Sequence, residues 1–254
     1  MKNIIYLDID GTVFSGKGIH PFTAEQIKRA VDAGHLVFIN TGRSRDIVPR
    51  EITDTLPVSG YVCGLGSYIE YNGTPLLSSV ISYKEVIWAL DFALRIKNKI
   101  TLEGEIGSCR YTLGEKTGHS FDVDSYDEAV KRIESMRVSK FTFARPLDER
   151  ELAEASEHFS VYNYPHYSEL GQKGYSKASG MRFLSDYFSI PRERSIAMGD
   201  SDNDLLMLGE AGIAVAMGNA CEKVKAIADF ETLDCDDGGV GYAINKLLFE
   251  REEN

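Results

Sequence analysis

Two aspartates near the start of the chain stand where a buried strand is predicted to end. The run Ile4-Ile5-Tyr6-Leu7 is continuously apolar rather than alternating, which is typical of a parallel strand buried on both faces. Asp8 follows it directly, and Asp10 lies just before Gly11, which allows a sharp turn. Chemistry in an open parallel sheet gathers beyond the carboxyl ends of its strands. Of two carboxylates placed there, one could act as nucleophile or metal ligand while the other moves protons.

Three further polar clusters follow or open predicted elements. Thr41-Gly42-Arg43 comes after the apolar run 36–39, and Lys177 starts a predicted helix. The third cluster is Gly199-Asp200-Ser201-Asp202-Asn203-Asp204, after the short run 195–198. Each has an ordinary structural explanation, because Asp and Gly favour turns and acids in a first turn favour the helix dipole. Together and in this order, however, the clusters supply acids, a hydroxyl and a cation, which favours a catalytic interpretation.

The segments that carry these clusters alternate between strand and helix. Thr23, with Gln26 three residues on, predicts a capping box at the start of a helix that Gly34 ends. A buried strand over 36–39 follows, and then a helix is predicted over 46–56. This order is typical of a parallel sheet with crossover helices.

The order changes in the middle of the chain. Asn72-Gly73 between two short apolar runs indicates a hairpin, and a capping box of Ser82 and Glu85 opens a helix. Short strands and helices then mix before the earlier alternation returns. We therefore predict an α/β fold with a Rossmann-like, doubly wound parallel sheet as its core and an inserted α+β domain. The predicted core is 1–82 and 170–254, and the predicted insert is 83–169.

Composition excludes several classes of protein. The net charge of -11 argues against a nucleic-acid surface, which needs clustered Lys and Arg. The four cysteines form no C-x-x-C pair, so zinc and a redox dithiol are not expected, and scattered cysteines suit a reducing compartment. No apolar run reaches membrane-spanning length and no leader pattern precedes the first strand, so we expect a cytoplasmic protein that contacts no membrane.

The four clusters resemble the motifs of the haloacid dehalogenase superfamily of phosphatases, and they are close to its Cof-type branch, subfamily IIB, which carries an inserted C2 cap. Asp8-Ile9-Asp10-Gly11-Thr12 is similar to the first motif and Thr41-Gly42-Arg43 to the second. Lys177 is similar to the third motif and 199–204 to the fourth. The resemblance covers the core on both sides of the insert. It implies a phosphoric monoester hydrolase whose insert acts as a lid that sets substrate specificity.

The resemblance also implies a role for each residue. Asp8 would attack phosphorus, and Asp10 would protonate the leaving alcohol and then activate water. Mg²⁺ would be held by Asp8, Asp10 (through its backbone carbonyl), Asp200 and Asp204, with Asp204 behind the direct ligands. The residues implied in binding phosphate are Thr41, Gly42, Arg43, Lys177 and Asn203.

Simple electrostatics agrees with this set of residues. A phosphomonoester dianion repels a carboxylate nucleophile, so a divalent cation has to offset the charge on both. Mg²⁺ prefers oxygen ligands from one or two carboxylates together with substrate phosphate. Charge that collects on the transferring oxygens would be stabilised by the Thr41 hydroxyl, the Gly42 amide and Lys177. We therefore predict a Mg²⁺-dependent phosphatase that forms an aspartyl-phosphate, with a small phosphorylated metabolite, such as a sugar phosphate or a phosphorylated cofactor, as its partner.

Two alternatives remain beside this prediction. One is a phosphotransferase or mutase, which the position of the insert argues against. The other is a non-catalytic regulator that binds a phosphorylated ligand on the same fold, which the complete set of acids argues against. One departure bears on substrate identity: Leu65-Gly66-Ser67 stands where the Cof-type branch usually has Asn-Gly-Ala.

Overall fold

The chain divides into two compact units. The computed structural model describes residues 2–250. Within them, the core unit comprises the stretch up to Gly42, Val48–Leu76, and the stretch from Ser176 onward. The insert unit comprises Arg43–Ile47 and Leu77–Tyr175. Residues 77–82 and 170–175, which were predicted to belong to the core, belong to the insert unit. Within that unit, Gln172 donates to the Ser79 carbonyl at 2.6 Å.

The core unit is built on a mostly parallel sheet. Its strand order within the described residues is β14-β13-β12-β1-β2-β3-β4-β5. The six strands from β14 to β3 pair in parallel, whereas β4 is antiparallel to β3. The strand bounds are β1 Ile4–Leu7, β2 Leu36–Asn40, β3 Gly60–Cys63, β4 Tyr68–Tyr71, β5 Thr74–Ser78, β12 Ser195–Gly199, β13 Ile213–Ala216 and β14 Phe230–Glu231.

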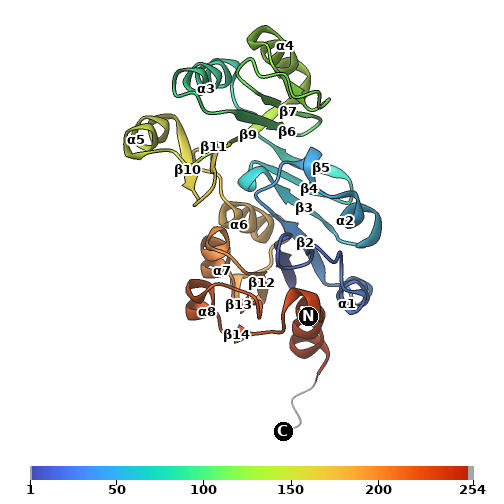
Figure 1. Ribbon diagram of the computed structural model, residues 1–254. Helices are drawn as coiled ribbons and strands as arrows, with labels where there is room; N and C mark the ends of the chain where they lie inside the picture. Colours follow the sequence, from blue (N-terminus) through green and yellow to red (C-terminus); the bar gives the residue numbers. More distant parts are fainter. Residues whose placement is uncertain (1, 251–254) are drawn as a thin grey trace. The chain divides into compact units, whose positions relative to one another are not determined.

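The order in which the chain adds strands to this sheet reverses between β1 and β12, which are neighbours in the sheet. From β1 the chain crosses through α1 (Pro21–Asp32) to β2 on one side, and from β12 it crosses through α7 (Leu205–Glu210) to β13 on the other. Because such crossovers are right-handed, the two helices cover opposite faces of the sheet (Figure 1). The remaining core helices are α2 Arg50–Thr55, α6 Lys177–Phe188, α8 Glu222–Ile227 and α9 Gly239–Ile244. The strand ends on either side of the reversal form the crevice where ligands bind in folds of this type.

The insert unit has its own sheet and its own core. The strand order among the described residues is β10-β11-β9-β6-β7-β8, and helices α3 Tyr83–Arg95, α4 Tyr126–Met136 and α5 Glu149–His158 accompany it (Figure 1). The helices and one sheet face enclose an apolar cluster that includes Phe92, Leu102 and Phe141. The strands are β6 Ile100–Gly104, β7 Ser108–Tyr111, β8 Asp122–Val123, β9 Val138–Phe143, β10 Phe159–Asn163 and β11 Ser168–Gln172. The observed fold class is thus the predicted one, an α/β core with an α+β insert.

Two predicted helix starts are wrong. Helix α1 begins at Pro21 and is capped by His20, whose Nδ1 accepts from the Phe22 amide at 3.2 Å, so Thr23 lies inside the helix and caps nothing. Proline suits the first helical position because its missing N–H has no partner there anyway. The helix predicted over 46–56 is a 3-10 turn at Arg45–Ile47 followed by α2, because Pro49 cannot donate in a continuous helix.

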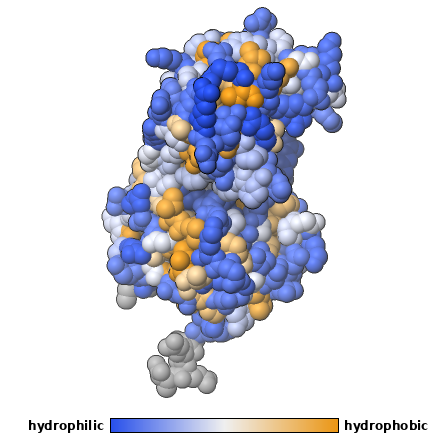
Figure 2. Space-filling model, turned by 60° about the vertical axis from the view of Figure 1, so that its left-hand side comes forward, coloured by the Kyte–Doolittle hydropathy of each residue, from blue (hydrophilic) through white to orange (hydrophobic). Residues whose placement is uncertain are grey.

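Other local predictions are confirmed. Ser82 and Glu85 form the capping box of α3, and α6 begins at Lys177, as predicted. The face of the molecule in Figure 2 is largely hydrophilic, in keeping with the high net charge. Across the described part of the chain, the helices are too short or too polar to cross a bilayer.

Candidate active site

The first two acids of the site come from neighbouring parallel strands. Leu7, the last residue of β1, pairs with Met198 of β12, and the Asp8 amide continues the ladder by donating to the Met198 carbonyl at 3.2 Å. Asp200 directly follows the end of β12. Both carboxylates therefore leave the sheet at the reversal point described above.

Three carboxylates meet there. Ligand oxygens of Asp8, Asp200 and Asp204 all lie within 4.8 Å of one another, and only Asp200 is partly exposed. Asp204 is fixed by its own loop, because its Oδ2 accepts from the backbone amides of Asp200 at 3.0 Å and Ser201 at 3.2 Å. Its Oδ1 points to the ammonium group of Lys177.

Lys177 joins this cluster from the first turn of α6. Its Nζ lies 2.6 Å from Asp8 Oδ1, 2.7 Å from Asp204 Oδ1 and 3.3 Å from Asn203 Oδ1. The start of α6 is fixed by a capping box, in which Ser176 Oγ accepts from the Ser179 amide at 3.1 Å. All three donors of the ammonium group are thus directed at oxygens of the site.

The electrostatics of the cluster favours a bound cation. Burial first, and then the charge of Asp204, raise the pKa of Asp8 to about 7, although Lys177 opposes this. The same two causes raise the pKa of Asp200 to about 6. Burial alone would lower the pKa of Lys177, but the charges of Asp204 and Asp8 outweigh it and hold that pKa above its usual range. Three carboxylates against one ammonium leave two negative charges, and an all-oxygen donor set of this kind fits Mg²⁺.

Asp10 lies outside the cluster of three carboxylates and is exposed. It belongs to a tight turn in which the Gly11 amide donates to the Phe14 carbonyl at 2.9 Å. Gly11 has a φ of +79°, and a Cβ there would lie 2.5 Å from Asp200 Oδ2. Only glycine allows the turn to pass this close to Asp200, which keeps Asp10 beside the cluster.

The residues predicted to bind phosphate divide between the units. Thr41 is buried, and its amide extends the sheet by donating to the Val62 carbonyl at 2.9 Å. Gly42 is the last core-unit residue of this stretch. Arg43 belongs to the insert unit, where its Nη1 donates to the Ile47 carbonyl at 3.4 Å.

Sequence reasoning missed two residues of the site's frame. Thr12 donates its hydroxyl to Asp200 Oδ1 at 3.3 Å. Asn219 donates to the Gly11 carbonyl at 2.8 Å and accepts from the Cys235 amide at 2.9 Å. A usable signal existed for Asn219, because it follows β13 at the same edge of the sheet as the predicted acids.

The substituted loop after β3 is held in an unusual conformation. Leu65 has a φ of 56° and a ψ of 37°, the left-handed region that asparagine tolerates better than leucine, and it is buried. Gly66 follows with a φ of +87°, and a Cβ there would lie 2.2 Å from the Ser176 carbonyl oxygen. The loop thus packs against the residue that precedes Lys177.

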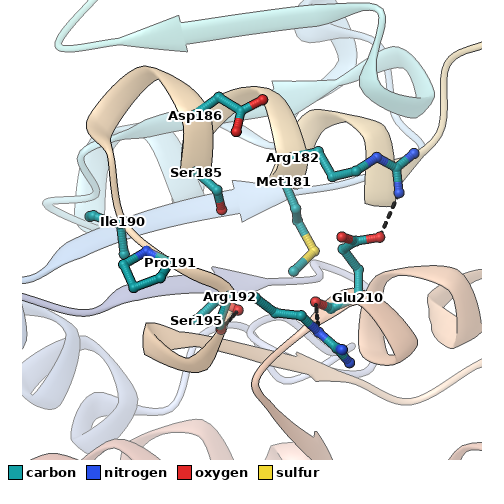
Figure 3. Close-up of a pocket in the computed structure, with 9 residues that line it drawn as sticks. All are labelled: Met181, Arg182, Ser185, Asp186, Ile190, Pro191, Arg192, Ser195 and Glu210. Atoms are coloured by element: carbon teal, nitrogen blue, oxygen red, sulfur yellow. Dashed lines mark hydrogen bonds and ion pairs between the residues drawn. The ribbon is translucent and has the colours of Figure 1, made fainter.

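A separate pocket of about 230 Å³ lies in the core unit beside the later turns of α6 (Figure 3). Both arginines that line the pocket bind Glu210, at the end of α7. Arg182 Nη1 lies 2.5 Å from Glu210 Oε2, and Arg192 donates to the Glu210 carbonyl at 2.8 Å. Ser195, the first residue of β12, lines this pocket. The pocket therefore lies at the amino end of β12, whereas the acids of the proposed site lie at its carboxyl end.

Comparison with known proteins agrees with this geometry. The model of the haloacid dehalogenase-like hydrolase family matches residues 5–244. The 5-amino-6-(5-phospho-D-ribitylamino)uracil phosphatase YitU of Bacillus subtilis is 30% identical, over 96% of this chain and 97% of its own.

Solved structures give the same result. A phosphatase of the superfamily from Bacteroides thetaiotaomicron has a TM-score of 0.82 at 26% identity, covering 97% of this chain and 95% of its own. A sugar phosphatase of subclass IIB has a TM-score of 0.79 at 27% identity, covering 96% and 98%.

Proposed function

This chain belongs to the haloacid dehalogenase-like hydrolases and is a phosphatase, and we propose that it hydrolyses the phosphate ester of a small metabolite with Mg²⁺ and an aspartyl-phosphate intermediate. The observation that carries the proposal is the cluster of Asp8, Asp200 and Asp204 around the ammonium group of Lys177. Sugar phosphates and phosphorylated cofactors are the substrate classes we favour. Proteins similar to this chain are named as a sugar phosphatase and as a 5-amino-6-(5-phospho-D-ribitylamino)uracil phosphatase, both of which act on small phosphorylated molecules.

The proposed chemistry has two steps. In the first, a carboxylate oxygen of Asp8 attacks phosphorus while the bond to the leaving oxygen breaks, and Asp10 gives that oxygen a proton. In the second, Asp10 takes a proton from water, which attacks the same phosphorus and releases inorganic phosphate and the Asp8 carboxylate. The exposure of Asp10 supports this role, because it has to meet both the alcohol and the water.

The other residues would stabilise charge. Lys177, the Thr41 hydroxyl and the Gly42 amide would hold the transferring phosphoryl oxygens, with Asn203 and Arg43 supporting the phosphate side. Asp8, Asp200 and the Asp10 carbonyl would hold Mg²⁺, with Asp204 behind them. When bound, the metal supplies positive charge that offsets both the carboxylates and the phosphate.

The proposal is tested by phosphate release from a panel of phosphorylated metabolites and an aryl phosphate. We expect release from some members with Mg²⁺ and none with excess chelator. Silence across the panel would favour a non-catalytic protein that binds phosphorylated ligands. Transfer to an added acceptor alcohol in preference to water would instead favour a phosphotransferase or mutase.

We further propose that the insert unit serves as a specificity lid that excludes water during the reaction. Its separate apolar core supports movement as one body. If so, backbone amides where the insert unit begins and ends, near Leu77 and Tyr175, should change their hydrogen-exchange rates when vanadate binds with Mg²⁺. Unchanged exchange there would contradict a moving lid.

The cytoplasmic location that the sequence suggests also stays a prediction.

A further inference from the structure

Asn40 is a polar residue in an apolar place. It ends β2, its side chain is fully buried, and the four residues before it are apolar. Its Nδ2 donates to the backbone carbonyl of Lys177 at 3.1 Å, whereas its Oδ1 is buried without a hydrogen-bond partner. Exchanging the two amide atoms would place an oxygen against that carbonyl, so chemistry fixes the donor. A half-paired buried amide is unfavourable for folding, and an apolar residue would suit the strand better.

The bond of Asn40 joins two parts of the proposed active site. Ile39 pairs with Leu7, so Asn40 lies in register beside Asp8, and Thr41 follows it along the chain. Lys177 is the first residue of α6. One side-chain amide therefore ties the strand end beside the proposed nucleophile to the backbone of the residue that supplies the ammonium group.

We propose that Asn40 is a positioning residue, which sets where the Lys177 ammonium group lies relative to Asp8 without touching substrate. The inference rests on the proposed function. A lysine side chain has several rotatable bonds, so its charge is placed well only if its backbone is fixed. The start of α6 is held from one side by the close approach of Gly66 to Ser176, and Asn40 fixes it from β2. Loss of this bond lets the first turn of α6 shift, and the ammonium group shifts with it.

The insert unit provides a matched control. Asn98 is also buried, and its Nδ2 also donates to a backbone carbonyl, that of Arg145, at 3.1 Å. Unlike Asn40, it is paired at both ends, because its Oδ1 accepts from the Arg145 amide at 3.2 Å. Both of these bonds are to Arg145, which is not among the residues proposed for the active site, so the removal of Asn98 measures what the loss of such an amide does to the fold.

The first test compares Asn40→Leu with Asn98→Leu on an aryl phosphate at saturating Mg²⁺. Turnover by the unchanged protein tests the proposed function separately. We expect Asn40→Leu to lower kcat roughly 10- to 100-fold, because small misplacements of catalytic groups have effects of that size, with little change in KM. Asn98→Leu should lower Tm and leave kcat unchanged. Wild-type kcat in Asn40→Leu, or an equal loss in Asn98→Leu, would overturn the inference.

The second test asks whether Asn40 acts through Lys177. In a Lys177→Met background the ammonium group is absent, so adding Asn40→Leu should lower kcat by less than about twofold. Losses that multiply would mean that Asn40 acts by another route. Asn40→Ser, whose hydroxyl is too short to reach the Lys177 carbonyl, replaces Asn40→Leu if the latter does not fold, with the same expected loss. If Lys177→Met is silent, the first comparison decides.

Discussion

Each unit of this protein buries a lysine among acids, and the two lysines differ in what surrounds them. The Lys177 side chain is 1% exposed and contacts Asp8 and Asp204 at 2.6 and 2.7 Å. The Lys140 side chain in the insert unit is 2% exposed and lies 2.5 Å from Glu169 and 3.6 Å from Glu103. In both cases burial would lower the lysine pKa, but the neighbouring acids raise it instead.

The location of the acids separates the two clusters. Glu103 is directly opposite Lys140 across β6 and β9, and Glu169 lies on the next strand, β11, so this cluster is a set of cross-strand neighbours within one sheet. The Lys177 cluster instead gathers side chains from strand ends and a helix start, and Asp200 adds a third acid. A buried lysine is therefore no sign of catalysis by itself. An excess of acid at the carboxyl ends of parallel strands is what distinguishes the proposed active site.

The largest effect should come from the nucleophile. Asp8→Asn keeps the shape of the side chain but removes the attacking carboxylate, so turnover should fall by on the order of 10⁴-fold or more. Asp202→Asn is the control, because Asp202 is paired with Lys223 at 2.5 Å and lies outside the cluster of three carboxylates. Release of phosphate from an aryl phosphate measures both. Substantial activity in Asp8→Asn would rule out the covalent mechanism.

The two lysines should respond in opposite ways to the same substitution. Lys177→Met should lower kcat roughly 100- to 1,000-fold, the scale of losing one group that stabilises charge in the transition state. Lys140→Met should leave kcat unchanged below its Tm and reduce the free energy of unfolding by about 3–5 kcal/mol, because Glu103 and Glu169 would stay buried without their cation. Steady-state kinetics and urea unfolding of both variants provide the comparison. A loss of kcat in Lys140→Met would give the insert cluster a catalytic role.

Features that depend on local sequence patterns could be predicted, whereas contacts between residues far apart in the sequence could not. The strand before Asp8 and the helix from Lys177 were predictable, because a continuous apolar run and a helical stripe are local patterns. Asp200 and Asp204 followed from their place after a strand. The hydrogen bonds of Thr12 and Asn40 were not predictable, because each joins a side chain to a residue far along the chain. Asn219 could have been singled out by its place after a strand, but its bond to Gly11 could not. The cap of α1 failed for the opposite reason: Thr23 matched a local pattern, but Pro21 and His20 provided a better start.

Bound Mg²⁺ should stabilise the folded protein through the core cluster, which is Asp8, Asp200 and Asp204 with Lys177, and not through the Lys140 cluster of the insert unit. Binding to the folded state raises the free energy of unfolding by about 2.7 kcal/mol at a concentration 100 times Kd. We therefore expect Mg²⁺ to raise the Tm of the protein and of Lys140→Met, but to have a much smaller effect on Asp200→Asn. Thermal unfolding with Mg²⁺ and with chelator measures this. An equal rise in Asp200→Asn would place the binding site elsewhere.

The smallest effect, and the most specific to the core cluster, is the pH dependence of stability without metal. The pKa of Asp8 is raised to about 7 and that of Asp200 to about 6, above the ordinary value of 3.8 for both. Between about pH 4 and pH 7 the folded protein therefore binds more protons than the unfolded chain does, so the free energy of unfolding falls as pH rises.

Lys140 behaves differently in the same experiment. Its pKa is raised from an already alkaline value, so its contribution is complete throughout that range and is lost only at high pH. Tm measured in chelator should therefore decline from about pH 5 to 7 in the unchanged protein and decline less in Asp8→Asn. Lys140→Met should show a slope at least as steep, at a lower Tm, because the acids around Lys177 are unchanged. A slope that persists in Asp8→Asn would assign the titration to groups outside the core cluster.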